Sequence, residues 1–498
     1  MRGRGVVFGL LVVLALAASG AVGTAHIQDL NLECVKPVYI IADDFNRDAY
    51  PDLAVACHSC NTVLVIPNVN GGMEPCKAFG GALSWTLDDS PVALASGYFI
   101  DPPVNPVNPP GWFFPLTSMF PNILVVTQYE PGLGRFSPLN ANSAPAFLAL
   151  QPGNVNKLDP LNQWFATLTH LTVGDFNNDG ALDVAVLDGL TPQIGIYSGN
   201  RATPAAAVPP NGSVSGGPVF TQPIGANRAY FVATGDFDRD GLLDLVVAAD
   251  GRLFFYRNTT NITAPGAAIT FAPPAPTAAN PTPITDIVLG TKVVGIAVAD
   301  FNRDGYLDLA AVDPEFGALS IVLNRGCWKF ELLQRIKKDG EPVFVVPLDC
   351  DRNGLIDLAV AERATSRVEI VLNELICHET ADGFKRPDPC DWTVPSPQYT
   401  AENIDHIQFF ASHSYPVGPG PISLAVADFD LNGMPDIAVA LSGGDGTTAP
   451  PPEVQIIYNP CCCRPCCEPS KPCEPPCCDQ ADSERDICPE KVGAAPKG

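Results

Sequence analysis

Short apolar runs alternate with acidic loops along most of this chain. In one example, the run from Val293 to Ala299 leads into the loop 300–308, and the run from Leu307 to Val312 leads out of it. A third run follows from Leu319 to Asn324. The runs are nearly continuously apolar, which is typical of strands covered on both faces. The pattern predicts β-hairpins, each extended by a third strand, that pack between neighbours of the same kind.

The unit recurs along the chain. Its acidic loops begin at Asp44, Asp175, Asp236, Asp300, Asp349 and Asp428. Units of about sixty residues with three or four short strands are typical of β-propellers. The interval between the first two loops is about two units long. It contains a strand-like run at 93–101 and another at 121–127, separated by a Pro-rich insertion at 102–120. We interpret these runs as a degenerate repeat without metal ligands; the alternative is a chance apolar run. The sequence therefore predicts an all-β fold, a seven-bladed β-propeller.

The last repeat ends one strand short. Its apolar runs at 422–427, 436–441 and 454–459 are followed directly by a segment rich in Pro and Cys. At the other end, residues 27–35 precede the first repeat and have no unit of their own. We expect this segment to supply the fourth strand of the final blade and close the ring. The alternative is a frayed terminus.

The acidic loops predict metal sites. Counting from the first Asp, each loop has Asp at position 1, Asp or Asn at positions 3 and 5, and Asp at position 9. The backbone carbonyl of position 7 can add a further oxygen. Hard oxygen ligands without His or Cys select calcium over zinc or copper. The predicted ligands are Asp44, Asn46, Asp48, Tyr50 and Asp52; Asp175, Asn177, Asp179, Ala181 and Asp183; Asp236, Asp238, Asp240, Leu242 and Asp244; Asp300, Asn302, Asp304, Tyr306 and Asp308; Asp349, Asp351, Asn353, Leu355 and Asp357; and Asp428, Asp430, Asn432, Met434 and Asp436.

Position 6 allows the sharp turn of these loops. It is Gly in five of them, because Gly adopts a positive φ at little cost. The first loop has Ala49 there, so we expect that site to be strained or weaker. These loops are not EF-hands, which need a Glu at position 12, where Val186, Val247 and Ala311 stand instead. A single loop could be an Asp-rich turn; six copies in one strand context favour about six structural Ca²⁺ ions.

The pattern Asp-Phe-Asn/Asp-x-Asp-Gly-x-x-Asp between strands resembles the FG-GAP/VCBS repeats of propellers like the N-terminal domain of integrin α-subunits. The resemblance covers about residues 27–459. It implies seven blades with calcium in the hairpin loops between the first and second strands. Two features depart from the family pattern: the second repeat lacks the ligands, and Cys350 replaces the usual Phe at position 2. The family includes adhesion proteins and a few enzymes, so the fold alone does not settle the function.

The two ends of the chain differ from the repeats. Residues 1–25 have a basic start, an apolar run from Val6 to Ala18 and a small-residue exit, which predicts a signal peptide. We expect residues 26–459 to form the propeller and 460–498 to be a disordered, low-complexity Cys/Pro-rich tail. No second stretch has the about 20 apolar residues of a membrane span. The expected location is secreted, at the cell surface or in the periplasm.

The composition of the chain limits the classes of partner that are expected. The net charge of −25 and the pI near 4.4 argue against nucleic acid or an anionic membrane surface, since both need a cationic face. With 43 Gly and 51 Pro, the chain favours short strands and turns over long helices. Its 46% hydrophobic residues are ample for a core and exclude a wholly disordered chain.

The 17 cysteines fall into two sets. Eight lie in the body in two groups of four, and we expect disulfides within each group; they are Cys34, Cys57, Cys60, Cys76, Cys327, Cys350, Cys377 and Cys390. For the Cys57-His-Ser-Cys60 motif, a small structural bridge is favoured over a redox or metal site. The other nine lie in the tail from Cys461. They predict disulfide cross-linking to other chains, with a soft-metal tether as the alternative.

No Gly-x-Ser-x-Gly, zinc-binding His-Glu pair or phosphate loop occurs in the sequence, and the six His are scattered. We therefore expect no enzyme. The favoured function is an exported recognition or adhesion module for a protein or glycan ligand, which would contact the long Pro/Gly-rich loops 101–120, 131–163, 201–222, 259–286 and 378–420. The alternatives are a propeller-type polysaccharide lyase or esterase, and a structural envelope component cross-linked through the tail.

Overall fold

The computed structural model describes one compact unit within His26–Cys461. The described residues are 26–32, 36–46, 48–69, 79–87, 90–97, 122–127, 132–136, 156–157, 167–199, 218–263, 268–276, 282–375, 407–443 and 453–458. The predicted signal peptide, the insertion at 102–120 and the Cys-rich tail lie outside them. Within the described residues, the regular structure is β-strand apart from one short 3₁₀ turn, His58–Cys60. No helix found there is long and apolar enough to cross a membrane.

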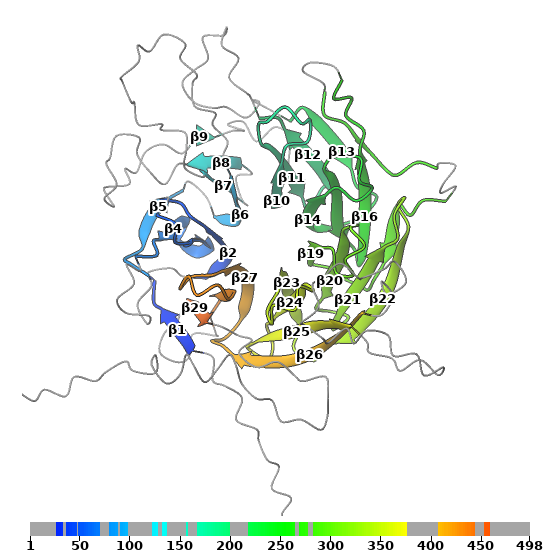
Figure 1. The fold of residues 1–498 in the computed structure, drawn as a ribbon. Coiled ribbons are helices and arrows are strands. Elements are labelled where there is room, and N and C mark those ends of the chain that lie inside the picture. The colour runs from blue at the N-terminus through cyan, green and yellow to red at the C-terminus, as the bar shows by residue number, and fades with distance from the viewer. Residues whose placement is uncertain are drawn as a thin grey trace, which may run out of the picture. The chain divides into compact units, whose positions relative to one another are not determined.

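The strands form antiparallel sheets, which we number 1 to 7 in chain order (Figure 1). Sheet 1 contains β2 (Pro37–Asp43), β3 (Asp52–Cys57), β4 (Thr62–Ile66) and β5 (Leu83–Thr86). Sheet 2 contains β6 (Pro91–Gly97), β7 (Asn122–Thr127), β8 (Gly132–Phe136) and β9 (Asn156–Lys157). Sheet 3 contains β10 (Leu168–Gly174), β11 (Asp183–Asp188), β12 (Gln193–Tyr197) and β13 (Phe220–Pro223).

The remaining sheets follow the same order. Sheet 4 contains β14 (Ala229–Gly235), β15 (Asp244–Ala249), β16 (Arg252–Asn258) and β17 (Phe271–Ala272), with β18 (Asp286–Val288) also paired to β16. Sheet 5 contains β19 (Gly295–Ala299), β20 (Asp308–Asp313), β21 (Ala318–Asn324) and β22 (Phe330–Lys337). Sheet 6 contains β23 (Pro342–Leu348), β24 (Asp357–Glu362), β25 (Arg367–Leu375) and β26 (Ile407–Pro416). Sheet 7 contains β27 (Pro421–Ala427), β28 (Asp436–Leu441), β29 (Val454–Tyr458) and β1 (His26–Leu30).

The sheets are arranged as the blades of a propeller. Their first strands contact one another in the order β2, β6, β10, β14, β19, β23 and β27, and β27 contacts β2. In Figure 1 these strands surround the centre of the ring. Hydrophobic clusters lie between adjacent sheets; one, for example, joins Leu53 and Val55 of sheet 1 to Phe429 and Ala438 of sheet 7. The core is thus divided among the sheet-to-sheet contacts.

The predicted strand pattern is confirmed in the second strands. Every residue of β3, β11, β15, β20, β24 and β28 is buried. A strand enclosed on both faces needs apolar side chains on both, which explains why its sequence does not alternate.

The prediction of seven blades, the second of them degenerate, is only partly met. Six sheets are blades with an acidic hairpin loop between their first two strands. Sheet 2 differs because the residues that join β6 to β7 lie outside the described part of the chain, and its β9 spans only two residues. The all-β propeller is therefore established with six full blades, and the degenerate seventh stays a prediction.

The N-terminal strand pairs with the last one. β1 runs antiparallel to β29, with His26 opposite Tyr458 and Leu30 opposite Val454. Side chains add to the pairing, since Gln455 Nε2 donates to Asp29 Oδ1 and Tyr458 Oη donates to Gln28 Oε1, each at 2.7 Å. The sequence predicted this role for residues 27–35; the strand spans His26–Leu30.

Four aromatic side chains from different sheets meet at the centre of the ring. Tyr39 Oη lies 2.9 Å from His170 Nε2, and the His170 ring stacks on Phe231 at 3.8 Å between centroids. Phe344 contacts Tyr39 at 5.7 Å and Phe231 at 6.0 Å. Each of the four follows a register shift at the start of its strand, and such bulges re-aim side chains. Burial lowers the pKa of His170 to about 3, so the imidazole is neutral at physiological pH.

Candidate metal centres

All six acidic loops have the same internal hydrogen bonds. The backbone N–H of position 6 donates to Oδ2 of the Asp at position 1, at 2.6 to 3.0 Å. The N–H of position 7 donates to Oδ1 of position 5, at 2.6 to 2.9 Å. The predicted side-chain ligands at positions 1, 3 and 5 are therefore brought together within each loop by the backbone that connects them.

The Asp at position 9 is the most constrained ligand candidate. It begins the second strand and is 0 to 1% exposed in every acidic loop. Its Oδ2 accepts the N–H of position 2 at 2.8 to 3.0 Å. In five loops its Oδ1 accepts an N–H from the end of the third strand. This carboxylate therefore ties the loop to both neighbouring strands.

Burial without a neutralising charge changes the acidity of these groups. Desolvation raises the pKa of Asp244, Asp308 and Asp357 to about 8, and that of Asp52 and Asp183 to about 7. Neighbouring carboxylates of the same loops raise it further. A bound cation would reverse both effects, because it favours the ionised form.

The residue at position 2 is a hydrophobic anchor between sheets. Phe237, for example, is fully buried with residues of sheets 4 and 5. Phe45, Phe176, Phe301 and Phe429 are buried in the corresponding clusters. Cys350 takes this place in sheet 6, where it is buried and disulfide-bonded.

In sheets 1, 4, 5 and 6, an Asn at the end of the third strand links the blade to the preceding sheet, a role that the sequence did not reveal. Asn324 Nδ2 donates to the carbonyl oxygen of Phe237 at 2.8 Å, across the boundary between sheets 5 and 4. Asn68, Asn258 and Asn373 make the same bond to Phe429, Phe176 and Phe301 at 2.7 to 2.9 Å. In sheet 3 the equivalent residue is Gly199. Its preceding neighbour is sheet 2, whose sequence has no acidic loop to supply the acceptor.

In the loops of sheets 3, 4 and 5, the residue at position 4 links the loop to the next one. Arg239 Nε donates to the Gly305 carbonyl at 2.6 Å, and its Nη2 donates to the Asp304 carbonyl at 2.8 Å. Arg303 Nε and Asn178 Nδ2 reach the Gly354 and Gly241 carbonyls in the same way. Adjacent loops from sheet 3 to sheet 6 are therefore coupled.

Position 6 shows why Gly is required in most loops. Gly305 has φ +83°, and a Cβ there would lie 1.4 Å from Arg239 Nη2. Ala49 also has a positive φ, +72°, which confirms the predicted strain. The preceding loop, in sheet 7, has Leu431 at position 4, so no arginine of that loop covers Ala49.

Replacing Ala49 with Gly is expected to stabilise the protein by about 1 kcal/mol, because the strain of a left-handed L-residue is relieved. Gly305→Ala should destabilise by more than that amount, since the new methyl group also displaces the Arg239 guanidinium. Urea unfolding of the three proteins checks both signs. A loss of stability in Ala49→Gly would contradict the strain at this loop.

The loops fit a hard divalent cation by their donor sets. Three of them place carboxylate oxygens of positions 1, 3 and 9 within 4.8 Å of one another; they are Asp236, Asp238 and Asp244, then Asp349, Asp351 and Asp357, then Asp428, Asp430 and Asp436. The other three loops have Asn at position 3. Oδ1 of Asp300 and of Asp349 are buried without a hydrogen-bond partner. Burial also raises the pKa of both groups. Unpaired buried carboxylate oxygens at position 1 are what a calcium ligand would leave.

The cysteine predictions are corrected in one respect. Cys60 has a free thiol, so the Cys57-x-x-Cys60 motif does not form a bridge of its own. Cys57 is disulfide-bonded. Four of the eight body cysteines lie outside the described residues; they are Cys34, Cys76, Cys377 and Cys390. The predicted disulfides within each group of four therefore stay a prediction.

Together, the sheets and their acidic hairpins define the class of an all-β propeller with repeated carboxylate loops. A family model described as "FG-GAP-like repeat" matches residues 236–311, from the acidic loop of sheet 4 into β20 of sheet 5. The fold is thus an all-β propeller in which residues 236–311 match an FG-GAP-like repeat. No curated protein matches it.

Solved structures share the fold only distantly. The crystal structure of BBS1N in complex with ARL6DN, soaked with mercury, is 12% identical, with a TM-score of 0.46 over 87% of this chain and 94% of that one. A functionally unknown protein from Desulfotomaculum acetoxidans DSM 771 is 10% identical, with a TM-score of 0.40 over 81% of this chain and 88% of that one. Neither likeness carries an argument about function.

Proposed function

We propose that the protein is an exported calcium-binding β-propeller that acts as a recognition or adhesion module for a protein or glycan ligand. The observation that supports it most is the repetition of one carboxylate loop in six sheets, each tied to its neighbours by buried hydrogen bonds. Six independent repeats of a costly buried Asp are hard to explain without a cation that neutralises it.

In the loops that bind it, calcium would be held by positions 1, 3, 5 and 9, with the carbonyl of position 7 as a further candidate. These positions belong to the chain that joins the first strand to the second, and position 9 also contacts the third strand. A bound ion would therefore hold three strands of one blade together. It supplies positive charge among carboxylates that otherwise repel one another. Its role in this proposal is structural.

The proposed recognition role is supported by a general property of rigid scaffolds such as this propeller. The ring is fixed by sheet-to-sheet bonds, and long loops on a rigid scaffold are where binding usually occurs. The candidate loop 101–120 and residues 378–406 of the candidate loop 378–420 lie outside the described residues, and residues 407–416 of the latter form β26. The predicted signal peptide and tail also lie outside, so export and cross-linking through the tail are proposals from sequence. We also propose binding rather than catalysis. One of the histidines, His170, contacts Tyr39 and Phe231 at the centre of the ring, where its role is in packing.

Two measurements test the proposal. Calcium bound per chain, by metal analysis after dialysis, should reach at least five in the full-length protein. A glycan and protein array, probed with and without calcium, should then give ligands whose binding needs the ion. Calcium binding without any array ligand would reject the recognition role, whereas turnover of an acidic polysaccharide would favour the lyase alternative. Absence of bound calcium would reject the proposal at its base.

A further inference from the structure

The loop of sheet 4 differs in charge from the other five. It alone has Asp at both positions 3 and 5, as Asp238 and Asp240. Each of the other acidic loops has one Asp and one Asn at these positions. The loop of sheet 4 therefore has four carboxylates where the others have three.

In the other loops the Asn side chain joins positions 3 and 5. An amide Nδ2 donates to the partner's Oδ2 at 2.9 to 3.2 Å in all five; the pairs are Asn46 and Asp48, Asn177 and Asp179, Asn302 and Asp304, Asn353 and Asp351, and Asn432 and Asp430. Two carboxylates cannot make such a bond, because an ionised carboxylate only accepts. Asp238 and Asp240 need a donor from elsewhere.

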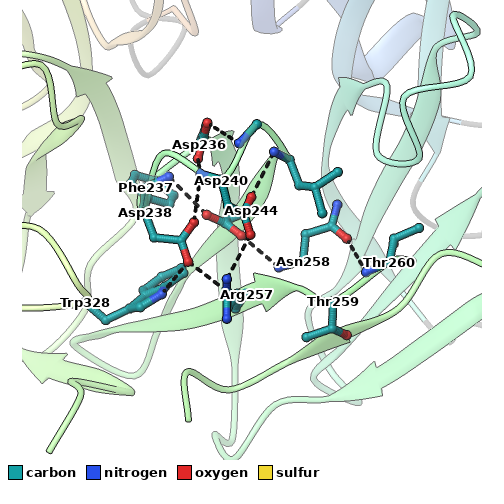
Figure 2. A network of polar contacts seen from close by, with 12 residues as sticks. Asp236, Phe237, Asp238, Asp240, Asp244, Arg257, Asn258, Thr259, Thr260 and Trp328 are labelled. Atoms are coloured by element: carbon teal, nitrogen blue, oxygen red, sulfur yellow. Dashed lines mark hydrogen bonds and ion pairs between the residues drawn. The ribbon is translucent and has the colours of Figure 1, made fainter. Parts of the chain in front are cut away.

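Arg257 contacts both carboxylates: it donates a hydrogen bond to Asp240 and forms an ion pair with Asp238 (Figure 2). Its Nε lies 2.7 Å from Asp238 Oδ2, and its Nη2 lies 2.9 Å from Asp240 Oδ2. Trp328 Nε1 also donates to Asp238 Oδ2, at 3.0 Å. The side chains of Asp238 and Asp240 are only 10% and 27% exposed, so water screens these contacts poorly.

The arginine is specific to this loop. Arg257 directly precedes Asn258, the Asn that links sheet 4 to sheet 3. The residues that precede the equivalent position in sheets 1, 3, 5, 6 and 7 are uncharged; they are Pro67, Ser198, Leu323, Leu372 and Tyr458. The extra carboxylate and the only cation at this position thus occur in the same blade.

We propose that Arg257 is the resident cation of the sheet 4 loop and excludes calcium from it, so that five acidic loops bind calcium and the sixth does not. The guanidinium bridges the position 3 and position 5 carboxylates, and its fixed positive charge repels a divalent ion at the same place. The loop is then held in its folded shape at any calcium concentration. This inference rests on the proposed calcium binding of the other loops.

Calcium stoichiometry of the full chain tests the inference. Wild type should bind five ions and Arg257→Gln six. Asp238→Asn should also bind six, although it removes a carboxylate, because it removes the Arg257–Asp238 ion pair and recreates the Asn–Asp pair of the sheet 3 loop. Arg252→Gln is the matched control; its ion pair with Asp286 lies outside the acidic loops, so it should bind five.

Terbium luminescence locates the additional ion. Terbium replaces calcium in oxygen sites and is excited by a nearby indole, and Trp328 adjoins the loop. Tryptophan-excited emission should rise at least twofold from wild type to Arg257→Gln, and Trp328→Phe in that variant should abolish the rise. Six ions in wild type would overturn the inference and leave the proposed function standing. So would an Arg257→Gln variant that gains no ion. Absence of calcium from every variant would overturn both.

Discussion

Replacing Asp308 with asparagine is expected to destabilise the protein by about 3 kcal/mol, even in calcium-free buffer. The side chain is fully buried, and each carboxylate oxygen accepts a backbone N–H, from Phe301 at 3.0 Å and from Asn324 at 2.7 Å. An asparagine offers one oxygen and one NH₂ group. The NH₂ group would face an N–H donor, which leaves a buried donor without a partner.

The same change four residues earlier serves as the control. Asp304→Asn alters position 5, where two other loops of this chain already have Asn353 and Asn432. Asparagine keeps the oxygen that accepts the Tyr306 N–H but loses the one that accepts the partly buried Asn302 Nδ2, so the expected loss is about 1 kcal/mol. Urea unfolding of both variants without calcium measures the difference. Equal losses would mean that loop charge, rather than the buried hydrogen bonds, makes position 9 important.

The second large effect concerns pH. The pKa of Asp244, Asp308 and Asp357 is raised to about 8 in the folded, metal-free protein, chiefly by burial. A carboxyl group whose folded pKa lies above its unfolded value stabilises the fold at low pH, and this contribution is lost as pH rises through the folded pKa. The metal-free protein should therefore lose stability between about pH 4 and pH 8.

Calcium should reverse this trend, because it binds the ionised carboxylates that the metal-free fold disfavours. A site at 100 times its dissociation constant contributes about 2.7 kcal/mol, so several sites should raise the melting temperature by on the order of 10 °C or more near pH 8.5. Near pH 5.5, where protons compete for the same oxygens, the shift should be less than about half as large.

Differential scanning calorimetry of resin-treated protein, with and without millimolar calcium chloride, measures both shifts. Sodium chloride at matched ionic strength controls for screening of surface charge. A calcium shift that is equal at both pH values would show that the position 9 carboxylates are not coupled to the ion. An unchanged melting temperature would reject structural calcium altogether.

The sequence was sufficient for the repeats and their loops because both are local. Positions 1 to 9 are adjacent along the chain, and the spacing of Asp300, Asp304 and Asp308 already brings their side chains together. The second strands could be predicted for the same reason, because a strand that is buried on both faces is recognised by a continuous run of apolar residues. Ala49 was identified for a similar reason, because turn geometry depends on one residue's φ.

The contacts between sheets could not be predicted in this way. Asn324 bonds to Phe237, 87 residues earlier, and no local pattern marks that partner. Alignment of the repeats gives a partial signal for the central cluster. Tyr39, His170, Phe231 and Phe344 each stand five residues before position 1 of their loops. Considered one at a time, these four aromatic residues have no visible relation to one another in the sequence. Only an alignment of the repeats shows that they occupy the same position in their strands.

The pairing of β1 with β29 determines when this protein can finish folding. A ribosome makes His26 long before its partner Tyr458, so the first strand must stay unpaired while the intervening blades are synthesised. Nascent blades can form in sequence through local hairpins, but the circle closes only after the last strand leaves the exit tunnel. Until that moment both ends present bare strand edges, so a chaperone that shields them during translation would suppress aggregation.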